Sequence, residues 1–295
     1  MVDKFTNNIT KQKIQFALGV LWIIDGCLQL QPKMFSSKFA NQVLVPASQG
    51  QPAFVHGPII FAVNIMLHNP ALINIIFVLT QLSLGVLILN KKTVRLGLNC
   101  SIIWALCVWY FGEGLGGLAG GQSSLLMGAP GAALLYAIIG FGVLPNDNDN
   151  SDTKIPSWFS YIWMAIWMGG EILLLWSQST VKTLSIMIAG NAKSAPKWLA
   201  SIDIHFSNWL LSRSEWFLAV ILLLYFAIGF TVLMSRKWRF TGIILGVILS
   251  ILFWIVGQSL GGYYTGLATD VSTAPLIIML GIAILGTKKI ELNLY

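Results

Sequence analysis

The most constraining feature of this sequence is a series of long apolar segments that carry almost no charge. Residues 70–90 contain no charged side chain, and residues 96–117 contain a single one, Glu113. About 20 apolar residues in an α-helix cross the roughly 30 Å hydrocarbon layer of a bilayer. Only 10% of the chain is charged, against about 25% in soluble proteins. The sequence therefore predicts an all-α, polytopic membrane protein surrounded by a lipid bilayer.

Apolar segments of suitable length recur along the chain. They predict eight transmembrane helices, at residues 14–31, 70–90, 96–117, 129–145, 157–176, 215–235, 240–258 and 273–287. Residues 32–51 are polar and are expected to be irregular. Residues 52–68, and an amphipathic stretch from Pro196 to Leu211 within a long loop at 177–214, are typical of helices that lie in the membrane interface.

An internal repeat organises these segments. A shift of 145 positions superposes Trp22 on Trp167 and Trp109 on Trp254, and in the middle of the repeat the shift becomes 144. It also superposes Gly112, Leu115, Gly116, Gly117, Ala129 and Pro130 on Gly257, Leu260, Gly261, Gly262, Ala274 and Pro275. The pattern predicts two four-helix membrane repeats, at 1–145 and 157–295, joined by a polar acidic linker at 146–156. Four spans return the chain to its starting side, so both repeats are expected to share one orientation.

The net charge of +7 is distributed in a way that predicts the topology. The short connections are basic, with Lys91, Lys92 and Arg95 in one and Arg236, Lys237 and Arg239 in another. Short basic loops stay in the cytoplasm, which predicts a multi-pass plasma-membrane protein with cytoplasmic N- and C-termini. The linker is then cytoplasmic, and the glycine-rich segments and long loops face outward. This bias accounts for the basic charge without a nucleic-acid partner.

The glycines of the repeated segment have a predicted role in packing. Gly112 and Gly116 form a GxxxG pair, as do Gly257 and Gly261, and each pair is followed by another glycine, Gly117 or Gly262. Small residues on one helix face let two helices approach closely. The six glycines are therefore predicted to be helix-packing residues. A re-entrant turn lined by backbone groups is the alternative.

The polar residues of the apolar segments are the candidate functional residues, because a carboxylate inside a span is costly. Asp25, Glu113 and Glu171 are predicted to line an outward-facing polar cavity between the two halves, with Gln258, His56 and His205 near the same face. Such a cavity suits a proton relay, a cation site or a polar ligand. Alternatively, these groups hold the halves in register, and Glu113 and its repeat partner Gln258 brace a loop. The histidines lack metal-binding spacing, and no metal site or catalytic residue is predicted.

Part of each repeat resembles a known family. The residues concerned are Gly19 and Gly26 in the first helix, and the run from Gln81 to Leu87 that leads into Thr93-Val94-Arg95-Leu96-Gly97-Leu98. This passage is similar to the DoxX-type family of small membrane proteins, whose relatives include the DoxD subunit linked to thiosulfate:quinone oxidoreduction. The resemblance implies a four-helix unit, a place in a membrane redox system and a quinone as the possible cofactor.

Three functions are consistent with these features. The first is a subunit or accessory component of a membrane redox or respiratory system, with other membrane subunits or a second copy of the chain as partners. The second is a small-molecule or ion permease that uses the predicted cavity. The third is a non-catalytic structural subunit that packs other membrane proteins through its glycines. The sequence leaves open whether the protein is an enzyme.

Overall fold

The computed structural model describes residues 9–121, 123–145, 154–176 and 181–287. Every regular element in these ranges is helical, and none of them contains a β-strand. Four of the described segments are long and apolar enough to cross a membrane. They are α5 (Pro70–Leu89), α6 (Val94–Phe111), α11 (Ser214–Thr231) and a segment, Arg236–Thr265, that comprises α12 (Arg236–Ile255) and the turn after it. These features indicate an all-helical membrane protein, as predicted.

Other apolar helices are shorter or carry charge. α4 (Ala53–His68), α7 (Ala132–Gly142) and α13 (Thr273–Leu285) form the shorter group, together with the segment Phe159–Leu175 of α8 (Phe159–Trp176). α2 (Lys11–Leu28) has 18 residues, three of them charged, namely Lys11, Lys13 and Asp25. Most of the predicted polar linker, residues 146–153, lies outside the described residues.

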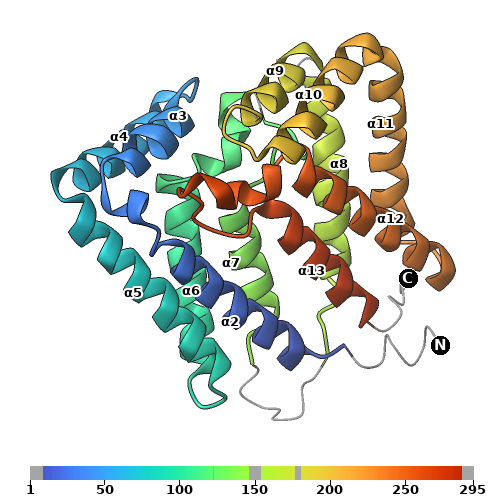
Figure 1. Cartoon of the computed structure of the whole chain (residues 1–295). Helices are drawn as coiled ribbons and strands as arrows, with labels where there is room; N and C mark the ends of the chain where they lie inside the picture. The colour runs from blue at the N-terminus through green and yellow to red at the C-terminus, as the bar shows by residue number, and fades with distance from the viewer. Residues whose placement is uncertain (1–8, 122, 146–153, 177–180, 288–295) are drawn as a thin grey trace.

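One end of the molecule is covered by short helices. Figure 1 shows α3 (Val45–Ser48), α4, α9 (Val181–Asn191) and α10 (Lys197–Ser212) together across the upper end. α9 corrects the prediction that residues 177–214 contain only one helix. It packs on α10, where the Ser185 and Ser207 hydroxyls lie 2.7 Å apart. Residues 32–51, predicted to be irregular, contain the helical turns η1 (Pro32–Phe35) and η2 (Ala40–Leu44) as well as α3.

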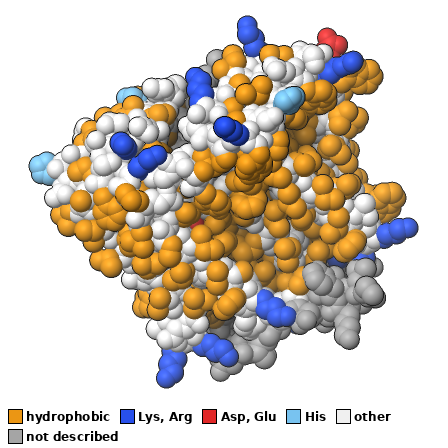
Figure 2. Space-filling view, viewed as in Figure 1, with side chains coloured by type: hydrophobic (Ala, Val, Ile, Leu, Met, Phe, Trp, Pro, Cys, Tyr) orange, Lys and Arg blue, Asp and Glu red, His pale blue; other side chains and the backbone are white. Residues whose placement is uncertain are grey.

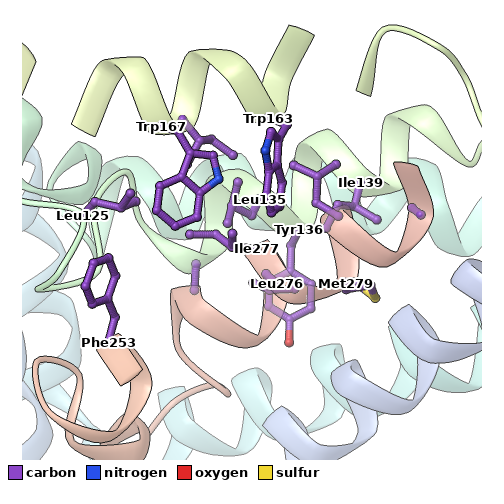
Figure 3. Close-up of a cluster of buried hydrophobic side chains, with 14 of the residues drawn as sticks. Leu125, Leu135, Tyr136, Ile139, Trp163, Trp167, Phe253, Leu276, Ile277 and Met279 are labelled. Carbon is purple, nitrogen blue, oxygen red and sulfur yellow. The ribbon is translucent and has the colours of Figure 1, made fainter. Parts of the chain in front are cut away.

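The interior and the surface of the bundle are both apolar. α7 and α13 contact each other near the centre, and Figure 3 shows their side chains packed against Trp163 and Trp167 of α8. The longer outer helices expose large apolar side chains, such as Leu79 (60%) and Leu223 (69%). Figure 2 shows this hydrophobic surface between upper and lower regions where Lys and Arg occur. An apolar surface of this extent indicates contact with lipid.

The repeated glycines lie in tight turns, which corrects the prediction that they form helix-packing GxxxG faces. α6 ends at Phe111 and α12 at Ile255, and each is followed by a 3₁₀ segment, η3 (Leu115–Gly120) or η4 (Ser259–Thr265). Four of the glycines have φ between 63° and 74°, namely Gly116, Gly117, Gly261 and Gly262. Glycine adopts positive φ without a steric penalty, so these four residues let the chain turn within η3 and η4, after each helix has ended. Gly112 and Gly257 lie just after the two helix ends.

Candidate functional site

A cavity of about 270 Å³ lies among the elements from α2 to α7. Most of its wall is apolar, and aromatic rings contribute much of it. We call it the aromatic cavity. Its aromatic and polar lining residues are Trp22, Asp25, Gln29, Phe39, Phe77, Gln81, Trp104, Phe111, Glu113, Tyr136, Thr269 and Asp270.

A hydrogen-bonded pair joins α2 to α7 at the wall of this cavity. The Tyr136 hydroxyl donates to the Asp25 carboxylate, and Asp25 is only 1% exposed. The Trp22 and Tyr136 rings pack at a centroid distance of 4.5 Å. Figure 3 shows the Tyr136 ring beside the buried cluster, with its oxygen directed away from Trp163 and Trp167. The pair therefore places a carboxylate and a phenol on the side of α7 that faces α2.

Several buried polar atoms around the cavity have no hydrogen-bond partner among the described residues. They are two donors, the indole nitrogens of Trp22 and Trp104, and three acceptors, Oδ1 of Asp25 and the Oε1 atoms of Gln29 and Gln81. All five residues line the aromatic cavity. Buried polar groups are normally paired in folded proteins. Unpaired donors and acceptors on residues that surround one space therefore make this space a candidate ligand-binding site.

Glu113 lies just after α6 and braces the start of α7. Its carboxylate accepts the backbone N–H of Ala133, the second residue of α7, at 3.1 and 3.3 Å. Gln258 does the same for α13, since its Oε1 accepts the N–H of Ala274, the second residue of that helix, at 3.0 Å. The first N–H groups of a helix lack intrahelical partners. Both side chains therefore supply an acceptor to the next helix, but only Glu113 also lines the aromatic cavity.

The environment of Glu113 favours its protonated form. Burial, followed by the nearby Asp270 carboxylate, raises the pKa of Glu113 to about 8. The backbone N–H groups of Ala132 and Ala133 act in the opposite direction, because they stabilise the carboxylate. Glu113 therefore changes its protonation state near physiological pH.

Asp270 closes the aromatic cavity from the loop between η4 and α13. Its carboxylate accepts the Ser272 N–H and the Thr269 hydroxyl, each at 2.7 Å, and burial raises its pKa. The loop is tied to the first half of the chain, because Thr273 donates to the Gly128 carbonyl at 2.6 Å. The sequence prediction missed Asp270, because a carboxylate in a polar loop is not expected to be buried in the membrane and therefore does not stand out.

The structure brings together only part of the predicted site. Asp25 and Glu113 share the aromatic cavity, whereas Glu171, Gln258, His56 and His205 do not line it. His56 and His205 are exposed, and their Nδ1 atoms contact the carbonyls of Ser48 and Ser201. The cavity also lies elsewhere than predicted. It is within the first half, and only Thr269 and Asp270 come from the second.

Tyr136, Gln29 and Gln81 were also missed as site residues. Gln81 falls in the middle of an apolar helix, where an uncharged side chain gives a weaker signal than a carboxylate. A search for intramembrane amides and phenols as well as acids would have found all three residues.

Comparisons with known proteins were made at three levels. No protein family, curated protein or solved structure matches this chain. The chemistry of the aromatic cavity therefore follows from its own lining.

That lining suits one kind of ligand. Aromatic and aliphatic walls favour a flat apolar body, whereas the indole N–H groups favour carbonyl or hydroxyl oxygens on it. The Asp25 and Asp270 carboxylates and Glu113 add sites that can hold or accept a proton. Among the described residues, no group of three or more His, Cys, Asp or Glu side chains is placed to hold a metal ion.

Proposed function

We propose that this protein binds a quinone in the aromatic cavity as an integral component of a membrane redox system. The observation that carries the proposal is the set of unpaired donors and acceptors around an aromatic-walled space. A quinone carbonyl accepts from the indole N–H groups of Trp22 and Trp104. A quinol hydroxyl donates to the Oε1 atoms of Gln29 and Gln81. The two redox forms of one molecule therefore match the two kinds of unpaired atom.

The carboxyl groups support the same function. Reduction of a quinone to a quinol takes up two electrons and two protons, and Asp25, Glu113 and Asp270 provide sites from which protons can be supplied. The electrons come from a partner redox subunit, which makes this protein a component or accessory of a larger system. The resemblance to the DoxX-type family supports the same assignment.

We also propose that the chain has eight spans in two repeats of the same orientation, with both termini in the cytoplasm. Two pieces of local geometry support the repeats. Glu113 and Gln258 each directly follow a glycine, Gly112 or Gly257, just beyond the end of a helix. Each then accepts the N–H of the second residue of the next helix. The intervening loop is shorter in the second copy, so Ala274 and Pro275 fall inside α13 whereas Ala129 and Pro130 precede α7.

In this scheme only the first repeat binds ligand. The shift of 145 places Gly170 where the first repeat has Asp25. The shorter loop pairs Ala133 with Ala274, which places Ile277 where the first repeat has Tyr136. The space is filled by three buried rings, those of Trp167, Tyr225 and Phe253, whose centroids are 5.5 to 6.5 Å apart. The second copy of the site therefore contains a packed aromatic core.

This filled core makes a prediction about stability. Tyr225 is fully buried, and its hydroxyl has no partner among the described residues. Tyr225→Phe should raise the free energy of unfolding by about 1 to 2 kcal/mol, because it removes an unpaired buried polar group. Thermal unfolding in detergent measures the change. A lower melting temperature would show that the hydroxyl is hydrogen-bonded in the folded protein.

Quinone binding can be tested with ubiquinone-1, a short-chain quinone. Isothermal titration of the detergent-solubilised protein, corrected with protein-free micelles, should give saturable binding. Trp104→Phe and Gln81→Leu should each weaken binding about tenfold, because each removes one hydrogen bond worth about 1 to 1.5 kcal/mol. Trp254→Phe is the matched control, since the Trp254 indole N–H is also unpaired but does not line the cavity.

Two results would contradict the proposal. One is the absence of saturable heat above the micelle blank, and the other is equal affinity in the Trp104→Phe and Trp254→Phe variants.

Solute flux into liposomes that is lost in Asp25→Asn, without quinone binding, would identify a permease instead. Purification under mild conditions should recover a redox partner in fixed proportion. Quinone reduction by the purified protein without any partner would contradict the accessory role.

A further inference from the structure

Glu113 lies between two cavities of different character. Besides the aromatic cavity it lines a second one, of about 230 Å³, which we call the loop cavity. The loop cavity is formed by α3, the η3 turn and the chain that leads to α7, with Met187 of α9. Among the described residues that line each space, Glu113 is the only one common to both. The two cavities therefore meet at a carboxyl group.

The loop cavity is suited to water. Its side-chain polar groups come from Gln49, Gln51, Ser123 and Ser124. Ser123 Oγ and Gln51 Oε1 are buried and have no partner among the described residues. A cavity of this size with unpaired polar atoms has both the room and the hydrogen-bonding groups that ordered water needs. It also lies toward the α3 and α9 end of the molecule, where Figure 1 shows the short helices.

On its other side Glu113 faces further acids. Asp270, from the loop before α13, carries the carboxylate whose charge raises the pKa of Glu113. Asp25 on α2 and Tyr136 on α7 line the same aromatic cavity, and Cys107 on α6 completes the titratable groups of its wall. No Lys, Arg or His is present among the described residues that line either cavity. Glu113 is therefore not held in its charged form by an ion pair, and its pKa of about 8 lets it take up and release a proton near neutral pH.

The backbone next to Glu113 leaves space for its carboxyl group. Gly131 has a φ of 103°, and a Cβ atom there would lie 2.3 Å from Glu113 Oε2. Glycine at this position therefore lets the carboxyl group reach the start of α7 while it borders both cavities.

We propose that Glu113 transfers protons between the loop cavity and the aromatic cavity. A hydronium ion in the water of the loop cavity gives a proton to the Glu113 carboxylate. One O–H bond of the hydronium breaks and leaves a water molecule, and an O–H bond forms on Glu113. That bond breaks when the proton passes to the Asp270 or Asp25 carboxylate in the aromatic cavity. Glu113 returns to its ionised form, and one proton has moved with no change of redox state. The role deepens the proposed function, because it supplies the protons that quinone reduction consumes.

The test uses infrared spectroscopy of the full-length protein in lipid, without quinone. After transfer to D₂O, protonated carboxyl groups exchange hydrogen for deuterium and their C=O band shifts. Wild-type protein should show a carboxyl band that is lost near pH 8 and is absent in Glu113→Gln. Hydrogen–deuterium exchange of the other carboxyl groups should be at least tenfold slower in Glu113→Gln than in the wild-type protein. The variant is expected to fold, because an amide at the equivalent position before η4, Gln258, makes the same contact to α13.

Two further variants test the loop cavity, and a third variant serves as a matched control. Gln51→Leu and Ser123→Val replace the unpaired oxygens of the loop cavity and should slow the same exchange. Glu171→Gln, which changes a carboxyl outside both cavities, should exchange at the wild-type rate. Wild-type exchange rates in Glu113→Gln, or in both folded loop-cavity variants, would overturn the proposal. Because no quinone is present, this failure is distinct from a failure of ubiquinone-1 to bind.

Discussion

Replacing Gly116 by alanine should prevent the protein from folding to a stable, monodisperse state. Gly116 has a φ of +63°, and a Cβ atom at this position would lie 1.9 Å from the Pro130 carbonyl oxygen and 2.2 Å from its carbon. Both atoms belong to the backbone, so no side-chain rotation relieves the contact. The η3 turn and the chain before α7 would have to separate, at a cost of about 4 to 5 kcal/mol or more. The measurements are size-exclusion chromatography and thermal unfolding in detergent.

Gly121→Ala is the matched control for this experiment. Gly121 also has a positive φ, +70°, but among the described residues, apart from Gly121 and its chain neighbours, no atom lies within 4 Å of a Cβ built there. Alanine at Gly121 should therefore cost only the backbone penalty of the left-handed conformation, about 1 to 2 kcal/mol. If the two variants unfold at the same temperature, the contact between η3 and Pro130 does not determine stability.

The second large effect is the dependence of stability on pH through Glu113. Its pKa of about 8 in the folded protein exceeds the ordinary value of 4.5. Below 4.5 the group is protonated in both the folded and the unfolded state. Between 4.5 and 8 only the folded state holds the proton, so the free energy of unfolding falls as pH rises. Above 8 this contribution is constant. The total change is about 3 to 5 kcal/mol, because each pKa unit corresponds to about 1.4 kcal/mol.

Glu113→Gln should remove this component of the pH dependence. The amide keeps the acceptor for Ala133 but cannot ionise. Wild-type and variant protein should unfold at similar temperatures at pH 5, and the variant should be more stable by several degrees at pH 9. Thermal unfolding across this pH range measures the difference, and the acidic end serves as the internal control. Parallel curves for the two proteins would contradict the assignment.

The fold was partly predictable because membrane helices have a strong sequence signal. Residues 70–90 contain no charge, and the structure has α5 at Pro70–Leu89. The glycine segments were harder, since GxxxG spacing is the same in a helix and in a turn. Gly116 and Gly117 are five and six residues after Phe111, the last residue of α6. Whether such glycines pack or turn depends on neighbouring backbone such as Pro130, which lies outside the local pattern.

The only site residues that could be predicted from the sequence are charged residues within apolar segments. Asp25 and Glu113 are acids in apolar segments, and both line the aromatic cavity. Glu171 has the same sequence character but lies outside it, because Glu171 belongs to α8 in the second half, and the cavity is lined by the first half together with Thr269 and Asp270. Asp270 reaches the cavity from a loop, because the folded chain brings this loop next to residues that are far away in the sequence. No local pattern contains that information.

The position of Asp270 has a consequence for how the protein is made. Asp25 lies on α2, whereas Thr269 and Asp270 come just before α13. A ribosome therefore has to synthesise the chain through this late loop before the wall of the aromatic cavity is complete. Until then Asp25, Gln81 and Tyr136 lack part of their enclosure in the bilayer. Any ligand that this cavity retains is consequently enclosed late in biogenesis, after insertion of the helices that surround it.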